Sequence, residues 1–148
     1  MNRIVTSKLC LFPARRLFST LNSNITKHSK LIVIGAGTGG LSVAGQLKNQ
    51  KIFNQSDITI FDPAKEHYYQ PGFTKIAGGV IQSNYVINNW VKYQINDVTS
   101  KYNFKNEAVA SIDPETNSIK TESGESWTYD HLVIASGLRL KKDSIPGN

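Results

Sequence analysis

LIVIGAGTGG, residues 31–40, decides the fold of this 148-residue chain. Residues 31–34 are apolar and mostly β-branched, which is typical of a short parallel strand buried on both faces. The glycines that follow have the spacing G-x-G-x-x-G, and Leu41, Ala44 and Leu47 then recur at helical intervals. We therefore expect a strand, a tight glycine-rich turn and a helix over residues 38–48.

A second strand is expected over residues 58–61, where Ile-Thr-Ile-Phe is again short and β-branched. Asp62 and Pro63 follow it, and proline does not continue the interior of a strand. Two parallel strands joined through a helix form a βαβ unit with a right-handed crossover. The fold class predicted for the chain is therefore α/β, with a parallel sheet.

Three glycines of the turn have separate physical tasks. Gly35 permits the sharp turn out of the strand, Gly37 lets a pyrophosphate approach the backbone, and Gly40 lets the helix pack close to the strand. Thr38 and Gly39 begin the helix, whose free N–H groups favour an anion. The spacing alone would fit a tight turn that binds nothing equally well.

Asp62 gives the turn its acidic partner, because it lies 22 residues after Gly40 and at the end of the second strand. A carboxylate there accepts hydrogen bonds from the ribose of a dinucleotide, and its charge disfavours the 2′-phosphate of NADP. This context favours a dinucleotide-binding turn, with Asp62 as a simple strand-ending cap as the alternative. The pattern does not separate NAD from FAD.

The second half of the chain has a different pattern of apolar residues from the first. Short apolar runs between residues 107 and 129 are separated by Asp-Pro and Ser-Gly turn signals, which predicts an antiparallel β-meander. Residues 131–135 are predicted to form another buried strand. Residues 80–106 are polar and show no clean period, so we expect a loop with short helical pieces there.

The net charge of +6 belongs to the N-terminal leader. Residues 1–30 carry six Lys or Arg, no Asp or Glu, and also His28, so the rest of the chain is balanced, which argues against a nucleic-acid-binding surface. An acid-free, basic segment with scattered Ser, Leu and Phe is typical of a mitochondrial transit peptide, which we place at residues 1–25. A disordered basic tail and a secretory signal are the alternatives.

Cysteine and histidine usage gives no sign of a metal site. Cys10 is the only cysteine, and His67 has no His or Cys partner at metal-ligand spacing. His67 is expected to be an orienting residue beside the cofactor pocket rather than a base. No apolar run approaches the ~18 residues that span a bilayer.

The segment Tyr129–Gly137 ends in Ala-Ser-Gly and resembles the second FAD signature of the pyridine nucleotide-disulfide oxidoreductase superfamily, in which the strand ends in Ala-Thr-Gly. The resemblance implies that FAD is the cofactor and that Gly137 passes beside the flavin. It also implies a flavoprotein with two dinucleotide-binding domains, here incomplete. Residues 30–148 would be the truncated N-terminal part of its Rossmann-like FAD-binding domain.

Within that superfamily, Phe61-Asp62-Pro63 followed by His-Tyr-Tyr-Gln-Pro at residues 67–71 resembles the mitochondrial sulfide:quinone oxidoreductase family. The resemblance implies that Thr38 and Gly39 contact the FAD pyrophosphate and Asp62 the ribose. It further assigns Gln70 to the cofactor and the backbone of Val109 to the adenine.

The same resemblance implies an activity for the whole protein. Hydrogen sulfide would be oxidised, and two electrons would pass through FAD to ubiquinone at the matrix face of the inner mitochondrial membrane, where a C-terminal region docks. The redox cysteines of that family lie beyond the Gly137 turn, so no catalytic residue is assigned here and the fragment alone is expected to be inactive. A type II NADH:quinone oxidoreductase, which has Phe-Thr-Pro in place of residues 67–71, and a non-catalytic nucleotide-binding module remain the alternatives.

Overall fold

The computed structural model describes residues 26–80 and 91–138, so the transit peptide expected at residues 1–25 lies outside the described residues. The elements in chain order are β1 (Lys27–Ile34), α1 (Thr38–Asn49), η1 (Gln55–Asp57), β2 (Ile58–Phe61), β3 (Glu66–Tyr68), α2 (Pro71–Ala77), β4 (Lys92–Gln94), α4 (Ile95–Thr99), β5 (Asn103–Lys105), β6 (Val109–Asp113), β7 (Ser118–Thr121) and β8 (Ser126–Ile134). The predicted βαβ unit and meander are both present.

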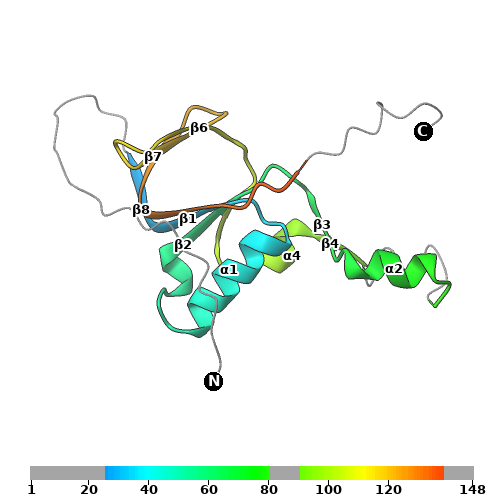
Figure 1. Ribbon diagram of the computed structural model, residues 1–148. Helices are drawn as coiled ribbons and strands as arrows, with labels where there is room; N and C mark the ends of the chain where they lie inside the picture. Colours follow the sequence, from blue (N-terminus) through cyan, green and yellow to red (C-terminus); the bar gives the residue numbers. More distant parts are fainter. Residues whose placement is uncertain (1–25, 81–90, 139–148) are drawn as a thin grey trace, which may run out of the picture.

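A six-stranded sheet forms the body of the molecule, with the strand order β5-β2-β1-β8-β7-β6 (Figure 1). β5, β2, β1 and β8 run parallel to their neighbours, whereas β6 and β7 form the antiparallel meander with β8. β8 therefore belongs to both halves of the sheet, because it pairs with β1 on one side and with β7 on the other.

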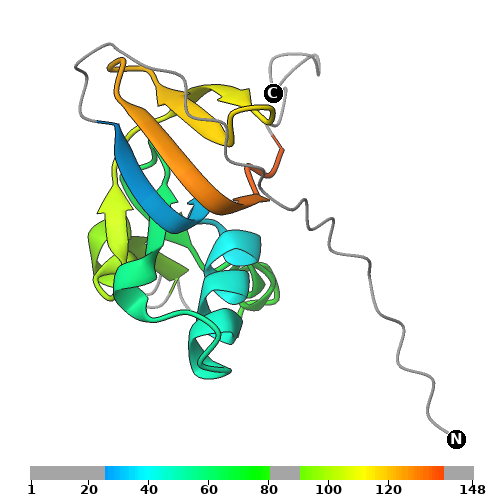
Figure 2. The same cartoon turned by 90° about the vertical axis from the view of Figure 1, so that its left-hand side faces the viewer.

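The core lies on both faces of β1, as the alternation of side chains along a strand requires. Leu31 and Val33 pack in a cluster with Ala44 of α1 and Ile95 of α4. Ile32 packs on the other face, in a cluster of buried side chains drawn from β2, β7 and β8. Figure 2 shows β1 and β8 side by side, with α1 on one side of them and the meander curling over the other.

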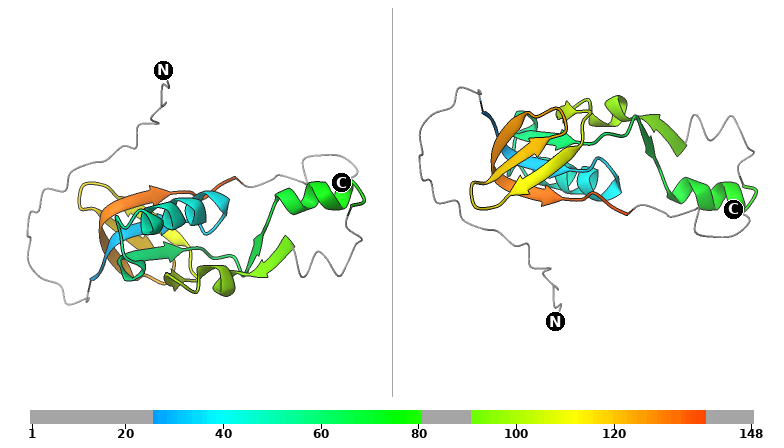
Figure 3. Two further views of the ribbon diagram at one scale, coloured as in Figure 1. Left: turned by 90° about the horizontal axis from the view of Figure 1, so that it is seen from below. Right: turned by 90° about the horizontal axis from the view of Figure 1, so that it is seen from above.

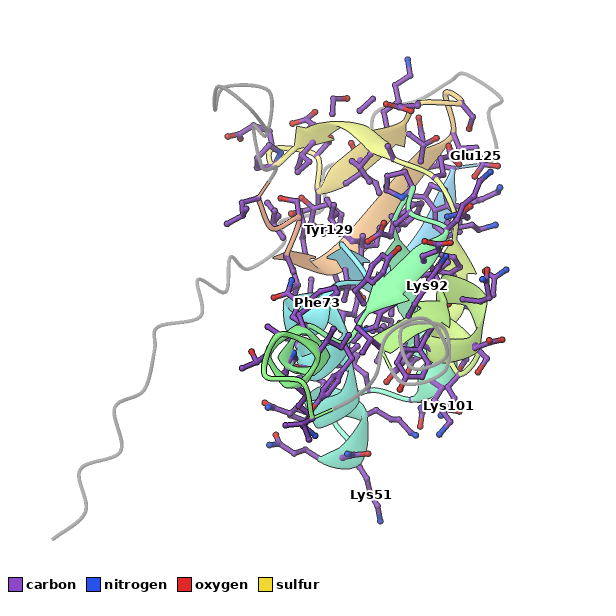
Figure 4. All side chains as sticks on the ribbon, turned by 90° about the vertical axis from the view of Figure 1, so that its right-hand side faces the viewer. Lys51, Phe73, Lys92, Lys101, Glu125 and Tyr129 are labelled. Carbon is purple, nitrogen blue, oxygen red and sulfur yellow. The ribbon has the colours of Figure 1, made fainter. Side chains whose placement is uncertain are left out.

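β1 begins earlier than the sequence predicted. The strand starts at Lys27, and His28, which we assigned to the leader, pairs with Thr128 of β8. Lys27 forms an ion pair with Glu125, which lies in the turn between β7 and β8, near the start of β1 (Figure 4). The polar start of β1 is not apolar enough to mark a strand, but β8 is long enough to supply it with a hydrogen-bonding partner.

Residues 92–105 are also more regular than expected. They form β4, α4 and β5, so a short helical piece is present as expected but two strands replace the predicted loop; residues 81–90 lie outside the described part of the chain. β5 extends the parallel sheet, because Asn103–Lys105 pairs with residues 59–61 of β2. Its Asn-Phe-Lys sequence contains one apolar residue, so no period of alternation was visible.

β3, β4 and α2 form an arm that stands away from the body (Figures 1 and 3). Lys92 of β4 forms an ion pair of 2.7 Å with Glu66 of β3, and Phe73 of α2 stacks on Tyr68 (Figure 4). The hydrogen bond from Lys92, followed by that from Tyr68, holds the pKa of Glu66 below its usual value. The stabilisation of the arm by this pair is therefore lost as the pH falls through that lowered pKa.

Candidate dinucleotide-binding site

Three strand ends meet at one edge of the sheet. The Gly35 N–H donates to the Phe61 carbonyl at 2.8 Å, which joins the end of β1 to the end of β2. The Ala135 N–H donates to the Ile34 carbonyl at 2.8 Å, which joins the end of β8 to β1. Since β1 has β2 on one side and β8 on the other, this edge is a topological switch point, where α/β sheets bind their ligands.

Packing within the chain explains the glycines at positions 35 and 40. Gly35 has a φ of +104°, and a side chain there would overlap the Ala135 carbonyl oxygen. A side chain at Gly40 would overlap the Gly35 carbonyl oxygen and meet the side chain of Val33 at 3.1 Å. Both residues are buried, and they let α1 and the end of β8 lie directly against the turn.

The glycine at position 37 has no such explanation among residues 26–80 and 91–138. Its backbone is extended, with φ −75° and ψ −173°, and a Cβ placed there would meet no described atom within 4 Å. Gly37 is the N-cap of α1, and the first turn of that helix contains no acidic residue and receives no side-chain cap. The open space and the free positive end of the helix fit an anionic group such as a pyrophosphate.

Thr38 and Gly39 share this exposed position at the start of α1, and Gly39 would place a Cβ 3.8 Å from that of Ala135. Gly137 lies two residues after Ala135. It has a φ of +70°, and a Cβ there would meet no described atom within 4 Å. The predicted residues of the glycine-rich turn and the Gly137 segment therefore lie along the same edge of the sheet.

Asp62 lies beside the turn, as predicted, but its carboxylate already holds the backbone. Oδ2 accepts the Ala36 N–H at 2.6 Å, and Oδ1 accepts the Ala64 N–H at 2.8 Å. A carboxylate offers about four lone-pair positions, so about two remain for ribose hydroxyls. Asp62 is thus able to bind a ligand and to fix the turn at the same time.

The loop that carries Asp62 is fixed from the end of β5. The Asp62 N–H donates to the Lys105 carbonyl at 3.1 Å. The side-chain amide of Asn106 donates to the carbonyl oxygens of Asp62 and Ala64, at 2.9 and 2.6 Å. These bonds explain why the residues after β5 matter to the site, although their sequence shows no motif.

His67 also reaches the glycine-rich turn; the sequence predicted an orienting role for it beside the cofactor pocket but did not predict its partner. Its Nδ1 lies 3.1 Å from the Ala36 carbonyl oxygen. The two other cofactor residues predicted from the sequence lie further along the chain. Val109 begins β6 and packs against the cluster that contains Phe61, whereas Gln70 is exposed on the arm, just before α2.

A cluster of metal ligands and a membrane-spanning helix are both absent from the described residues, 26–80 and 91–138. No group of three His, Cys, Asp or Glu side chains in them is placed to hold a metal ion. No helix among them has the length and apolar character needed to cross a membrane.

Sequence comparison connects this architecture to known proteins. Residues 29–148 match the pyridine nucleotide-disulphide oxidoreductase family. The chain belongs to this family. Members of the family are FAD-dependent flavoproteins, so the predicted fold class and the predicted cofactor are confirmed.

Individual relatives in the family support the predicted resemblance. The chain is 34% identical over 119 residues to the mitochondrial sulfide:quinone oxidoreductase of Dictyostelium discoideum. The aligned residues cover 80% of this chain and 25% of that protein. The crystal structure of the sulfide:quinone oxidoreductase from Aquifex aeolicus matches with a TM-score of 0.60 and 32% identity, over 79% of this chain and 26% of that one.

A second kind of relative is the type II NADH:quinone oxidoreductase of Staphylococcus haemolyticus, which is 29% identical over 122 residues, 81% of this chain and 29% of that protein. The chain therefore spans about a quarter of the length of the curated relatives that it matches.

Proposed function

We propose that this chain is the FAD-binding portion of a sulfide:quinone oxidoreductase. The observation that carries the proposal is the glycine-rich turn, in which Gly37 faces open space at the start of α1 with Asp62 beside it. Similarity to sulfide:quinone oxidoreductases from a eukaryote and a bacterium supports the choice of substrate.

Each predicted residue has a role toward FAD in this proposal. Backbone N–H groups of Gly37, Thr38 and Gly39 bind the pyrophosphate, and Asp62 accepts the ribose hydroxyls. Gly35 and Gly40 shape the turn, and the segment ending at Gly137 passes beside the flavin. Val109 contacts the adenine through its backbone, and Gln70 reaches the cofactor from the arm.

The chain contributes binding rather than catalysis. In the proposed reaction sulfide would lose two electrons and two protons to become sulfane sulfur, and ubiquinone would gain both to become the quinol. The residues of the glycine-rich turn and Asp62 would hold FAD, which when bound would supply the two-electron redox chemistry between them. Sulfide attack in this family needs a cysteine pair, and the only cysteine of this chain is Cys10, in the leader. We therefore propose that the 148 residues alone are inactive toward sulfide.

A type II NADH:quinone oxidoreductase is the second candidate, because a relative of that kind also matches the chain. Sequencing the transcript beyond the codon for Asn148 separates the candidates. A continuing frame with two cysteines downstream supports sulfide oxidation. A continuing frame without them supports the NADH enzyme, and an authentic stop codon supports a stand-alone nucleotide-binding module.

The proposal places the protein in mitochondria, with residues 1–25 as the transit peptide and docking to the matrix face of the inner membrane through a C-terminal region. We expect residues 1–25, fused to a fluorescent protein, to direct it into mitochondria, because a basic, acid-free segment is drawn inward by the negative potential of the matrix. Microscopy of cells that express the fusion measures this. Diffuse cytosolic fluorescence or secretion would contradict the assignment.

Asp62 provides the direct test of FAD binding. We expect Asp62→Ala to weaken FAD binding by about 10- to 100-fold, because charge-assisted hydrogen bonds contribute about 1.5–3 kcal/mol each. Asp62→Asn is expected to lose less, since its one oxygen still accepts a bond. Titration of the apo chain, followed by the quenching of flavin fluorescence, gives the dissociation constants.

The matched control is Asp97→Asn, which removes the same charge from an exposed position on α4. It is expected to bind FAD as the wild-type chain does. A wild-type chain that binds no FAD, or an Asp62→Ala variant that binds as well as the control, rejects the proposed site.

A further inference from the structure

Two successive peptide groups of the glycine-rich turn are held by side chains from one short segment, residues 62–67. The Ala36 N–H, which belongs to the peptide between Gly35 and Ala36, donates to Asp62 Oδ2 at 2.6 Å. The Ala36 carbonyl, which belongs to the next peptide, lies 3.1 Å from His67 Nδ1. The segment after β2 therefore fixes the orientation of both peptide planes that lead into Gly37.

The direction of one group in a peptide determines the direction of the other. In a planar trans peptide the C=O and N–H bonds point in opposite directions, and the described residues contain no cis peptide bond. The first plane shows the effect: the Ala36 N–H points to Asp62, and the Gly35 carbonyl on its other side lies against Gly40. The same geometry applies to the second plane. Because His67 holds the Ala36 carbonyl, the Gly37 N–H on the other side of that peptide points away from His67.

The state of the His67 ring follows from its partner. A carbonyl oxygen only accepts hydrogen bonds, so Nδ1 of His67 carries the proton and donates it. His67 lies in β3, where it pairs with Tyr93 of β4, and it is half-buried. The two-stranded arm therefore holds the imidazole in place against the turn.

We propose that His67 is a positioning residue for the cofactor, which aims the Gly37 N–H at the FAD pyrophosphate by holding the Ala36 carbonyl. This inference rests on the proposed function of the turn. His67 itself does not touch the pyrophosphate in this role, because it acts on the opposite side of the peptide plane. Through this bond the arm contributes to the affinity for FAD, in addition to the contact proposed for Gln70.

Three substitutions separate this role from general support of the fold. His67→Asn keeps a donor N–H on the atom bonded to Cγ, as in Nδ1 of histidine. His67→Gln moves the donor one bond further out, and His67→Phe keeps a ring of similar size without any donor. We expect FAD to bind about tenfold more weakly to the Gln and Phe variants, and within about threefold of wild type to the Asn variant.

Two measurements on the full chain accompany the FAD titration. The ¹³C chemical shift of the Ala36 carbonyl in the apo chain reports its hydrogen bond, and we expect it to move in the Gln and Phe variants but not in the Asn variant. Urea unfolding of the same apo chains gives their free energies of unfolding. A merely structural role predicts FAD affinities that follow these free energies instead of the donor position.

The outcomes are distinct. An Ala36 carbonyl shift that is the same in all four proteins overturns the inference, as do equal FAD affinities for the Asn, Gln and Phe variants. A wild-type chain that binds no FAD overturns the proposed function and the aiming role together, while the carbonyl shift still decides whether His67 holds the turn.

Discussion

A chain with valine in place of Gly37 is expected to remain folded and to lose FAD. The backbone at this position is extended, which valine adopts readily, and a Cβ there meets no described atom within 4 Å. The same side chain fills the space that the pyrophosphate needs beside the N-terminus of α1. We expect affinity to fall at least about 100-fold, a change of about 2.7 kcal/mol, with the purified protein colourless.

Flavin absorbance and far-ultraviolet circular dichroism together measure this outcome. Gly45→Ala is the control on the same helix, because the Tyr102 hydroxyl, at 4.0 Å, is the only described atom within 4 Å of the Cβ it adds. That variant should keep both the flavin and the dichroism signal. If Gly37→Val also keeps the yellow colour, the turn has been assigned to the wrong ligand.

Gly40→Ala is expected to have the opposite effect and to destabilise the fold of the chain. Its Cβ would overlap the Gly35 carbonyl oxygen, a backbone atom next to the turn that cannot rotate away. Overpacking of this kind costs about 3 kcal/mol or more. In a domain of this size such a loss lowers the melting temperature by more than about 10 °C, which thermal unfolding of the apo chain measures.

The neighbouring glycine provides the comparison. A Cβ at Gly39 would lie 3.8 Å from the Cβ of Ala135, an ordinary contact, and alanine favours the helical conformation more than glycine does. Gly39→Ala is therefore expected to be at least as stable as the wild-type chain. Equal melting temperatures for the Gly39→Ala and Gly40→Ala variants would contradict the close packing of α1 on the turn that the structure shows.

The sequence predicted those parts of the fold whose signals are local. Residues 31–40 carry a strand, a turn and the start of a helix in a single stretch, and the two glycines with packing roles, Gly35 and Gly40, follow from the spacing alone. The meander was equally predictable from the sequence, because Asp-Pro and Ser-Gly turns separate its strands. Each of these features depends on neighbours within a few residues.

The features that were missed depend on partners far along the chain. β5 has one apolar residue and becomes a strand because β2 lies beside it. The first residues of β1 are polar and become a strand because β8 pairs with them. His67 and Asp62 reach Ala36 across 31 and 26 residues, respectively, and no period or spacing in the sequence encodes those two hydrogen bonds.

The double pairing of β8 has a consequence for the order of events in folding. Its register on β1 joins Lys27 to Trp127 and Ile34 to Ile134, so the centre of the sheet closes a loop of about 100 residues. α1 and the β1–β2 pair depend on nearer partners and are able to form while the ribosome is still making the chain. The centre of the sheet forms only after β8 has emerged, and a topology with such distant contacts folds slowly. Until then, Ile32 and the face of β1 that the meander covers remain open to solvent and to chaperones.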